Sequence, residues 1–269
     1  MTLFPTSRSR FERAIAHVKA FDAEWKRVVG PDAYEIITKP NSDWTQGATW
    51  AVRKTSGENT LALELGEFFY QLRASLDALI YQASIFFKCS LSASEKENLY
   101  FPCCKTPKSF EASTIHKIPF PKDLSDWLEA LQPYKAANTT DPNMLEVIRI
   151  VALINTCAKI DRHRHLHVVA AFPTRIEVEY IATPPTITVT DIKRIRINFL
   201  ESESPFLVFG LRGVDLSREN NIKLKTNLRL EVSVDQVPIA PSETFDLEVQ
   251  KMLSVVDGII RFFEDGFKQ

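Results

Sequence analysis

Residues 65–82, LGEFFYQLRASLDALIYQ, are the part of the chain that decides the fold. They belong to a longer stretch, 59–88, in which apolar residues occupy nearly every side of a helical projection. A helix of this kind is buried on most sides, so the sequence predicts a long helix at the centre of a bundle. Arg73 and Asp77 interrupt the apolar surface. A charge is expensive to bury unless it is paired, so these residues predict either an ion pair that fixes the packing or the wall of an interior cleft.

The charges on this helix also argue against a membrane. Glu64, Glu67, Arg73 and Asp77 are more charges than a span of about 20 residues tolerates. The start of the chain lacks the apolar core of a secretory signal, and the four cysteines show no paired C-x-x-C spacing. We therefore expect a cytoplasmic protein with reduced thiols and no membrane contact.

The segments around the central helix predict an α+β protein. Residues 9–29 place apolar side chains three and four apart, which indicates an amphipathic helix. YEIITK (34–39) and ATWAVRK (48–54) alternate in polarity on either side of a polar turn and predict a small β-hairpin. From about 167 to 236 the polarity again alternates with a period of two, which predicts an antiparallel sheet.

Two more helices are expected after the central one. Asp141-Pro142 favours a helix start, because Asp accepts hydrogen bonds from free amides and Pro has no amide to lose. Pro241-Ser242 is expected to begin the last helix. The predicted division is a mainly helical part, 1–170, with its core at about 59–167, and a part at 171–269 with the sheet and the C-terminal helix. The pattern leaves open whether the two parts pack as one domain.

The bulk composition excludes several classes of function. The 269 residues are 45% hydrophobic and 25% charged, as in ordinary globular proteins. A formal net charge of −1 provides no general attraction to nucleic acid, so any such binding needs a local patch. The chain has 8 glycines against 15 prolines and carries neither G-x-G-x-x-G nor a P-loop motif. We therefore expect no dinucleotide-binding or P-loop site.

KIDRHRHLHVV (159–169) holds three of the five histidines in the chain. In a helix His163 and His167 lie one turn apart, and in a strand all three histidines point the same way, so either form brings metal ligands together. Arg162 and Arg164 add positive charge that opposes a dication, and one carboxylate lies nearby. We therefore expect neither a metal nor another cofactor here.

The helix that leads into this cluster predicts a polar pocket. Asn155, Lys159 and then Arg162 or His163 fall on successive turns of one face. If that face meets the central helix, ionisable groups from both helices line one interior site, as is usual in helical bundles. The predicted pocket and phosphate-binding residues are Arg73, Asp77, Asn155, Lys159 and Arg164.

The sequence Arg162-His163-x-x-x-His167 resembles the R-polar-x-x-x-H motif of the HEPN superfamily, whose helical domains include many bacterial ribonucleases. The resemblance implies RNA cleavage without a metal, with His167 or His163 handling protons and Arg162 stabilising the phosphate charge. It also implies a homodimer, because two protomers of that family usually join their motifs. The predicted catalytic residues are Arg162, His163 and His167.

A broader resemblance covers about 60–170. LGEFFYQLRASLDALIYQ, FP, LQPY and LINTCAKIDRHRHLH, in that order, look like a widespread group of uncharacterised bacterial proteins. The helices of that group read roughly G-[DE]-x-x-x-x-L-R-[SA]-x-L-D-H and N-x-x-x-K-H-R. This chain has Ala78 where the group often has His, so the additional R-x-x-x-x-H motif at Arg73 is broken here. The resemblance implies a shared pocket that includes Arg73, Asp77, Asn155, His163 and Arg164.

A second candidate surface lies on the predicted strands. One strand face carries Lys223, Lys225, Asn227 and Arg229, and another carries Arg194 and Arg196. Neighbouring strands would form a basic strip for phosphates. Glutamates on the adjoining strands dilute this charge, and the sequence favours a solvated outer face.

Two functions of different classes follow from these patterns. The first is a metal-independent endoribonuclease, or a protein that binds RNA or a nucleotide phosphate, at the Arg/His pocket. The alternative is a non-enzymatic interaction or ligand-sensing protein in which the Arg/His/Asp cluster is structural.

Overall fold

The computed structural model describes residues 3–29, 34–41, 45–53, 58–163, 168–181, 187–194, 205–213, 223–234 and 244–267. Contacts divide the chain into two units. The helical unit comprises residues 1–21, 62–166 and 236–269, and the strand unit comprises residues 22–61 and 167–235. The predicted α+β class is confirmed.

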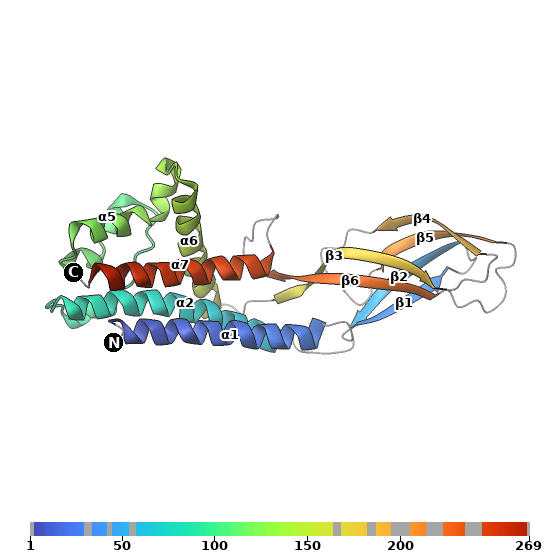
Figure 1. Cartoon of the computed structure of the whole chain (residues 1–269), viewed down its shortest axis with the longest axis horizontal. Helices are drawn as coiled ribbons and strands as arrows, with labels where there is room; N and C mark the ends of the chain where they lie inside the picture. Colours follow the sequence, from blue (N-terminus) through green and yellow to red (C-terminus); the bar gives the residue numbers. More distant parts are fainter. Residues whose placement is uncertain are drawn as a thin grey trace. The chain divides into compact units, whose positions relative to one another are not determined.

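The helical unit is built around four long helices. They are α1 (Pro5–Val29), α2 (Glu58–Phe86), α6 (Pro142–His163) and α7 (Phe245–Gly266). Figure 1 shows α1, α2 and α7 side by side, with α6 crossing their direction. Shorter helices connect α2 to α6: α3 (Ala93–Glu97), α4 (Pro107–Glu111), η2 (Thr114–Lys117), α5 (Lys122–Ala130) and η3 (Pro133–Asn138).

Helix α2 supplies much of the core, as its apolar sequence predicts. Its wholly buried side chains are Phe68, Phe69, Leu72, Leu76, Leu79 and Ile80. Burial of a large apolar side chain stabilises the fold by about 1.5–3 kcal/mol. This helix therefore fixes the position of any polar side chain that it carries between those residues.

Small polar residues join α1 to α2. The Ser7 hydroxyl donates to the Ser75 carbonyl oxygen at 2.9 Å, and the Ser75 hydroxyl donates to the Ser7 carbonyl oxygen at 2.9 Å. Both residues are fully buried. The reciprocal bonds satisfy groups that would otherwise be costly to bury, and the small side chains let the two backbones approach closely. Farther along the same pair of helices, His17 Nδ1 lies 2.8 Å from a carboxylate oxygen of Glu64.

The last two long helices start at capping residues. Helix α6 begins at Pro142, as predicted, and the Asp141 carboxylate accepts the Asn143 amide at 2.9 Å. The predicted start of the last helix at Pro241-Ser242 is wrong, because α7 begins at Phe245 with Thr244 as its N-cap. The Thr244 hydroxyl accepts the Leu247 amide at 3.3 Å, so it caps the helix as serine would.

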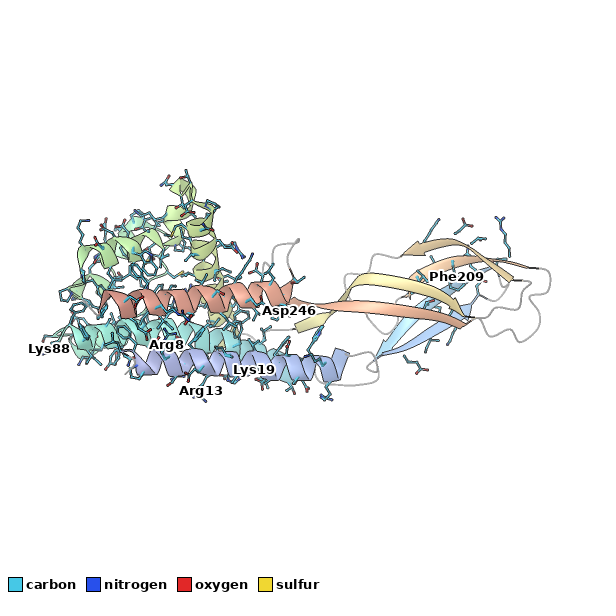
Figure 2. The ribbon with its side chains drawn as sticks, in the orientation of Figure 1. Arg8, Arg13, Lys19, Lys88, Phe209 and Asp246 are labelled. Carbon is cyan, nitrogen blue, oxygen red and sulfur yellow. The ribbon has the colours of Figure 1, made fainter. Side chains whose placement is uncertain are left out.

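Helix α7 packs in the helical unit through both ion pairs and apolar side chains. Arg8 of α1, labelled in Figure 2, pairs with Glu264 at 2.6 Å and also with Asp257. Arg149 of α6 donates to the wholly buried carboxylate of Glu248 at 2.8 and 3.0 Å. The buried residues of the helix are Phe245, Glu248, Val249, Met252, Val256, Ile259, Ile260 and Phe263.

The strand unit contains two antiparallel sheets. One has the order β1-β2-β5-β4, and the other pairs β3 with β6. The strands are β1 (Tyr34–Pro40), β2 (Gln46–Arg53), β3 (Val168–Ile181), β4 (Ile187–Arg194), β5 (Pro205–Gly213) and β6 (Lys223–Val234). The predicted hairpin is confirmed as β1 and β2.

The division into units differs from the single predicted boundary near residue 170. The N-terminal hairpin belongs to the strand unit because β2 pairs with β5, and α7 belongs to the helical unit. Each unit is therefore made of segments that lie far apart in the sequence.

The basic strip proposed for the strands does not form between the described parts of these strands. Arg194 ends β4 in the four-stranded sheet, whereas the basic residues of β6 lie in the two-stranded sheet, and Arg196 lies outside the described residues. Lys225 is paired across the strands with Glu179.

Adding a side chain at Gly47 of β2 is expected to destabilise the strand unit. Gly47 lies opposite Phe209 of β5, labelled in Figure 2, whose ring is 2% exposed. A β-carbon on Gly47 would overlap that ring. We expect Gly47→Ala to lower the free energy of unfolding by about 1–3 kcal/mol, because the buried ring has little room to move.

The control for this prediction is Gly258→Ala in α7, where an added β-carbon meets no described atom within 4 Å. That change is expected to stabilise the chain by about 0.5–1 kcal/mol through helix propensity. Urea unfolding of both variants measures the difference. Equal stabilities for the two variants would show that Phe209 does not restrict Gly47.

Candidate functional site

A cavity of about 450 Å³ lies in the helical unit, within the size range of small-molecule sites. We call it the Arg73 cavity. Helix α2 contributes Arg73 and Asp77, α6 contributes Asn155, Ala158 and Lys159, and the chain between α3 and α4 contributes residues from Asn98 to Cys104. The cavity reaches solvent, because Tyr100 and Lys159 are both exposed.

Buried Arg73 and partly exposed Asp77 form a clamp on the backbone of Phe101. An Nη2 hydrogen of Arg73 is donated to the Phe101 carbonyl oxygen at 2.6 Å, and the Asp77 carboxylate accepts the Phe101 amide at 2.9 Å. The two side chains also pair with each other, with Nη2 of Arg73 2.9 Å from Oδ1 of Asp77. The clamp holds the irregular segment around Phe101 against α2, so part of the predicted Arg/Asp role is structural.

The clamp leaves one end of the Arg73 guanidinium unused. Arg73 is 8% exposed, and its Nη1 atom is buried without a hydrogen-bond partner among the described residues. A buried donor is nearly always satisfied in folded proteins, and an unsatisfied one in a cavity points to a missing acceptor. Arginine has five donors in a planar fork and stays charged, so it suits an anionic oxygen.

Helix α6 places two more polar groups on the cavity wall. Asn155 and Lys159 are four residues apart and therefore lie on successive turns of one helical face. Their side chains add an amide and an ammonium group to the guanidinium of Arg73. Thr114 adds a hydroxyl group from the start of η2, whereas the Ser113 hydroxyl already donates to the Phe110 carbonyl oxygen at 2.6 Å. The cavity thus combines two cations with several neutral donors.

The charge of the lining is positive. Asp77 is an acidic residue of the wall, and its carboxylate is already bonded to Arg73 and to the Phe101 amide. Lys159 adds a second positive charge. In partly dehydrated surroundings such charges attract an anion more strongly than they do in water.

The pKa of the Cys103 thiol reflects the charges around the cavity. Burial raises the pKa of its thiol above the ordinary value of 9.0, while Arg73 and, to a smaller extent, Lys159 act to lower the pKa. Both cations therefore lie close enough to stabilise a negative charge at this wall. The shift is upward overall because dehydration of the thiolate outweighs that attraction.

This pKa shift predicts slow alkylation of Cys103. Because thiolate is the reactive form, the rate with iodoacetamide is expected to be low near about pH 8 and to rise steeply above about pH 9. In Lys159→Gln the rise should move to still higher pH, because a group that lowers the pKa is lost. Peptide mass spectrometry resolves the rate at each cysteine. Rapid alkylation of Cys103 at neutral pH would contradict the buried environment.

The structure brings four predicted pocket residues, Arg73, Asp77, Asn155 and Lys159, to this one cavity. The predicted Arg164 and His167 lie outside the described residues. Arg162 and His163 end α6, in the turn after Lys159, and their side chains are also outside the description. The predicted catalytic group therefore stays a prediction.

Sequence reasoning missed the wall formed by the chain between α3 and α4. Asn98, Tyr100, Cys103 and Cys104 line the cavity from a segment without helix or strand. Helical and strand periodicity give no information there. The available signal was indirect: Arg73 and Asp77 on a buried helix require partners, and a nearby irregular backbone supplies them.

A second hollow of about 320 Å³ contrasts with the Arg73 cavity. Its wall includes Glu129 and Lys135, which already pair with each other at 2.6 Å. Asp126, also in the wall, pairs with Lys122. The charged groups of this hollow thus pair with each other or with Lys122, whereas Nη1 of Arg73 has no partner in the described part of the chain.

Comparisons with protein-family models, with curated proteins and with solved structures give no significant match to this chain. The resemblance to the HEPN superfamily therefore stays a prediction from the motif. Among the described residues, no group of three or more His, Cys, Asp or Glu side chains is placed to hold a metal ion. No helix in the described ranges is both long and apolar enough to cross a membrane.

Proposed function

We propose that the helical unit binds a phosphate-bearing ligand in the Arg73 cavity. The observation that carries the proposal is Arg73 itself: it lines a cavity that also contains Lys159, and its buried Nη1 has no acceptor among the described residues. A phosphate oxygen supplies the missing acceptor and a negative charge. Guanidinium groups match the geometry of phosphate oxygens and are held here by the Phe101 clamp before the ligand arrives.

The supporting groups also fit a phosphate. Lys159 supplies a cation, and the Asn155 amide and the Thr114 hydroxyl supply neutral donors. Pairing of Asp77 with Arg73 reduces the repulsion that a free carboxylate would exert on an anion. Binding that relies on exposed Lys159 is expected to weaken as salt increases.

The matched ligands for the test are ribose 5-phosphate and ribose, which differ by the phosphate alone. Calorimetric titration of the full chain at low ionic strength is expected to show binding of ribose 5-phosphate and no comparable binding of ribose. Lys159→Gln should weaken ribose 5-phosphate binding by about 12-fold to 140-fold, since a charge-assisted hydrogen bond contributes about 1.5–3 kcal/mol.

The control protein is Lys19→Gln, which removes the same charge from an exposed position of α1 (Figure 2). It is expected to bind as the wild type does. The proposal fails if ribose and ribose 5-phosphate give the same result, or if the two lysine variants weaken binding equally.

A metal-independent ribonuclease is the second candidate function, favoured by one feature of α6. The helix continues beyond Asn155 and Lys159 to Arg162 and His163, so the residues of the predicted catalytic motif begin in the next turn. RNA as substrate and a homodimer belong to this second candidate.

RNA cleavage in EDTA tests this candidate. Wild type, Arg162→Ala, His163→Ala and His167→Ala are compared on a pool of single-stranded and structured RNA, with melting temperatures measured in parallel. Cleavage lost in Arg162→Ala and in a histidine variant of unchanged melting temperature supports the enzyme. A wild type that binds ribose 5-phosphate but cleaves no RNA supports the ligand-sensing alternative.

A further inference from the structure

Tyr100 is an exposed aromatic residue on the wall of the Arg73 cavity. It is 53% exposed and lines the same space as Arg73 and Lys159. Among the described residues its ring pairs with no other aromatic ring, whereas the exposed Phe262 stacks on Trp127 with ring centroids 4.2 Å apart. An aromatic surface at a positively charged cavity is therefore left open to a ligand.

The backbone next to Tyr100 is held in place. The Phe101 amide donates a hydrogen bond to Asp77, and its carbonyl oxygen accepts one from Arg73. The residue is 1% exposed. The backbone next to Tyr100 is therefore held beside the cavity by α2 before a ligand binds. Less backbone conformational entropy is lost when a ligand binds to a segment that is already fixed.

We infer that the phosphate-bearing ligand is a mononucleotide whose base stacks on Tyr100. The inference rests on the proposed phosphate site and deepens it. Guanidinium and ammonium groups bind the phosphate, and the phenol ring supplies a surface for the base. Asn98 and Asn155, which also line the cavity, each carry both a donor and an acceptor for a base edge. The volume of about 450 Å³ suits a single small ligand.

The test compares adenosine 5′-monophosphate with ribose 5-phosphate, which lacks the base. Stacking of a base on an aromatic side chain is expected to make the nucleotide bind about 5-fold to 140-fold more tightly. In Tyr100→Leu the ratio of the two affinities should fall to about one, and Tyr100→Phe should restore most of it, because stacking needs the ring and not the hydroxyl. Melting temperatures show whether each variant is folded.

The possible outcomes separate the two proposals. Equal affinities for the two compounds in the wild type overturn the stacking inference and leave the phosphate site standing. A nucleotide preference that survives in Tyr100→Leu places the base elsewhere and also overturns it. Absence of binding by both compounds overturns the phosphate site and, with it, the nucleotide inference.

Discussion

Replacing Asp77 with alanine is expected to lower the free energy of unfolding by about 3–5 kcal/mol, among the largest effects of any single change in the helical unit. The substitution removes the carboxylate that pairs with the buried guanidinium of Arg73 and accepts the Phe101 amide. A buried charge that loses its partner retains its full desolvation penalty. The segment around Phe101 also loses one of its two attachments to α2.

Two further variants distinguish the loss of the buried ion pair from other effects of the Asp77→Ala substitution. Asp77→Asn keeps an oxygen that can accept the Phe101 amide and removes the charge, so it is expected to fall between wild type and Asp77→Ala. Asp126→Ala breaks another pair at i,i+4 spacing, with Lys122, but both partners are exposed. It should change stability by less than about 1 kcal/mol. Urea unfolding followed by circular dichroism gives all three values, and similar losses for Asp77→Ala and Asp126→Ala would contradict the clamp.

Arg149→Met is the second substitution with a large expected effect, and it should lower the free energy of unfolding by about 3–5 kcal/mol. Arg149 donates to both oxygens of Glu248, which is wholly buried between α6 and α7, and also pairs with Glu146 at 2.7 Å. Methionine retains much of the apolar stem and removes the guanidinium. The control is Arg261→Met, whose ion pair with Asp257 is largely exposed on the arginine side and should contribute less than about 1 kcal/mol.

The pH dependence of stability tests the ion pairs of Arg149 in a second way. Hydrogen bonds from Arg149, then from Lys251, lower the pKa of Glu146 from 4.5 to about 2, against the upward effect of burial. Because the folded pKa is the lower one, the stabilisation is present above about pH 4.5 and is lost as pH falls toward 2. Arg149→Met should therefore flatten the fall in stability over this range. An unchanged acid slope would show that Glu146 does not depend on Arg149.

Local sequence patterns were sufficient for the helices that build the site. The apolar run around residues 65–82 predicts a buried α2. Arg73 and Asp77 predict either an ion pair or a cleft wall, and the structure shows both. Asp141-Pro142 predicts the start of α6. These features depend on helical periodicity and on capping, which are properties of neighbouring residues.

Features that depend on residues far apart in the sequence could not be predicted from local patterns. The pairing of β2 with β5 joins residues 46–50 to residues 205–210, and no local pattern selects that partner. The start of α7 depended on a choice between two capping residues, Ser242 and Thr244, and the structure uses Thr244. The Phe101 carbonyl oxygen accepts from Nη2 of Arg73 and the Asp77 carboxylate accepts from Nε, which leaves Nη1 without an acceptor among the described residues.

The most direct test of the central claim is protection of Cys103 by a ligand. Cys103 lines the Arg73 cavity, whereas Cys89 does not. The full chain is treated with iodoacetamide at a pH above about 9, where the Cys103 thiolate forms, with and without saturating adenosine 5′-monophosphate. We predict slower alkylation of Cys103 in the presence of the nucleotide and the same rate at Cys89. Equal Cys103 rates with and without the nucleotide would contradict phosphate binding in this cavity.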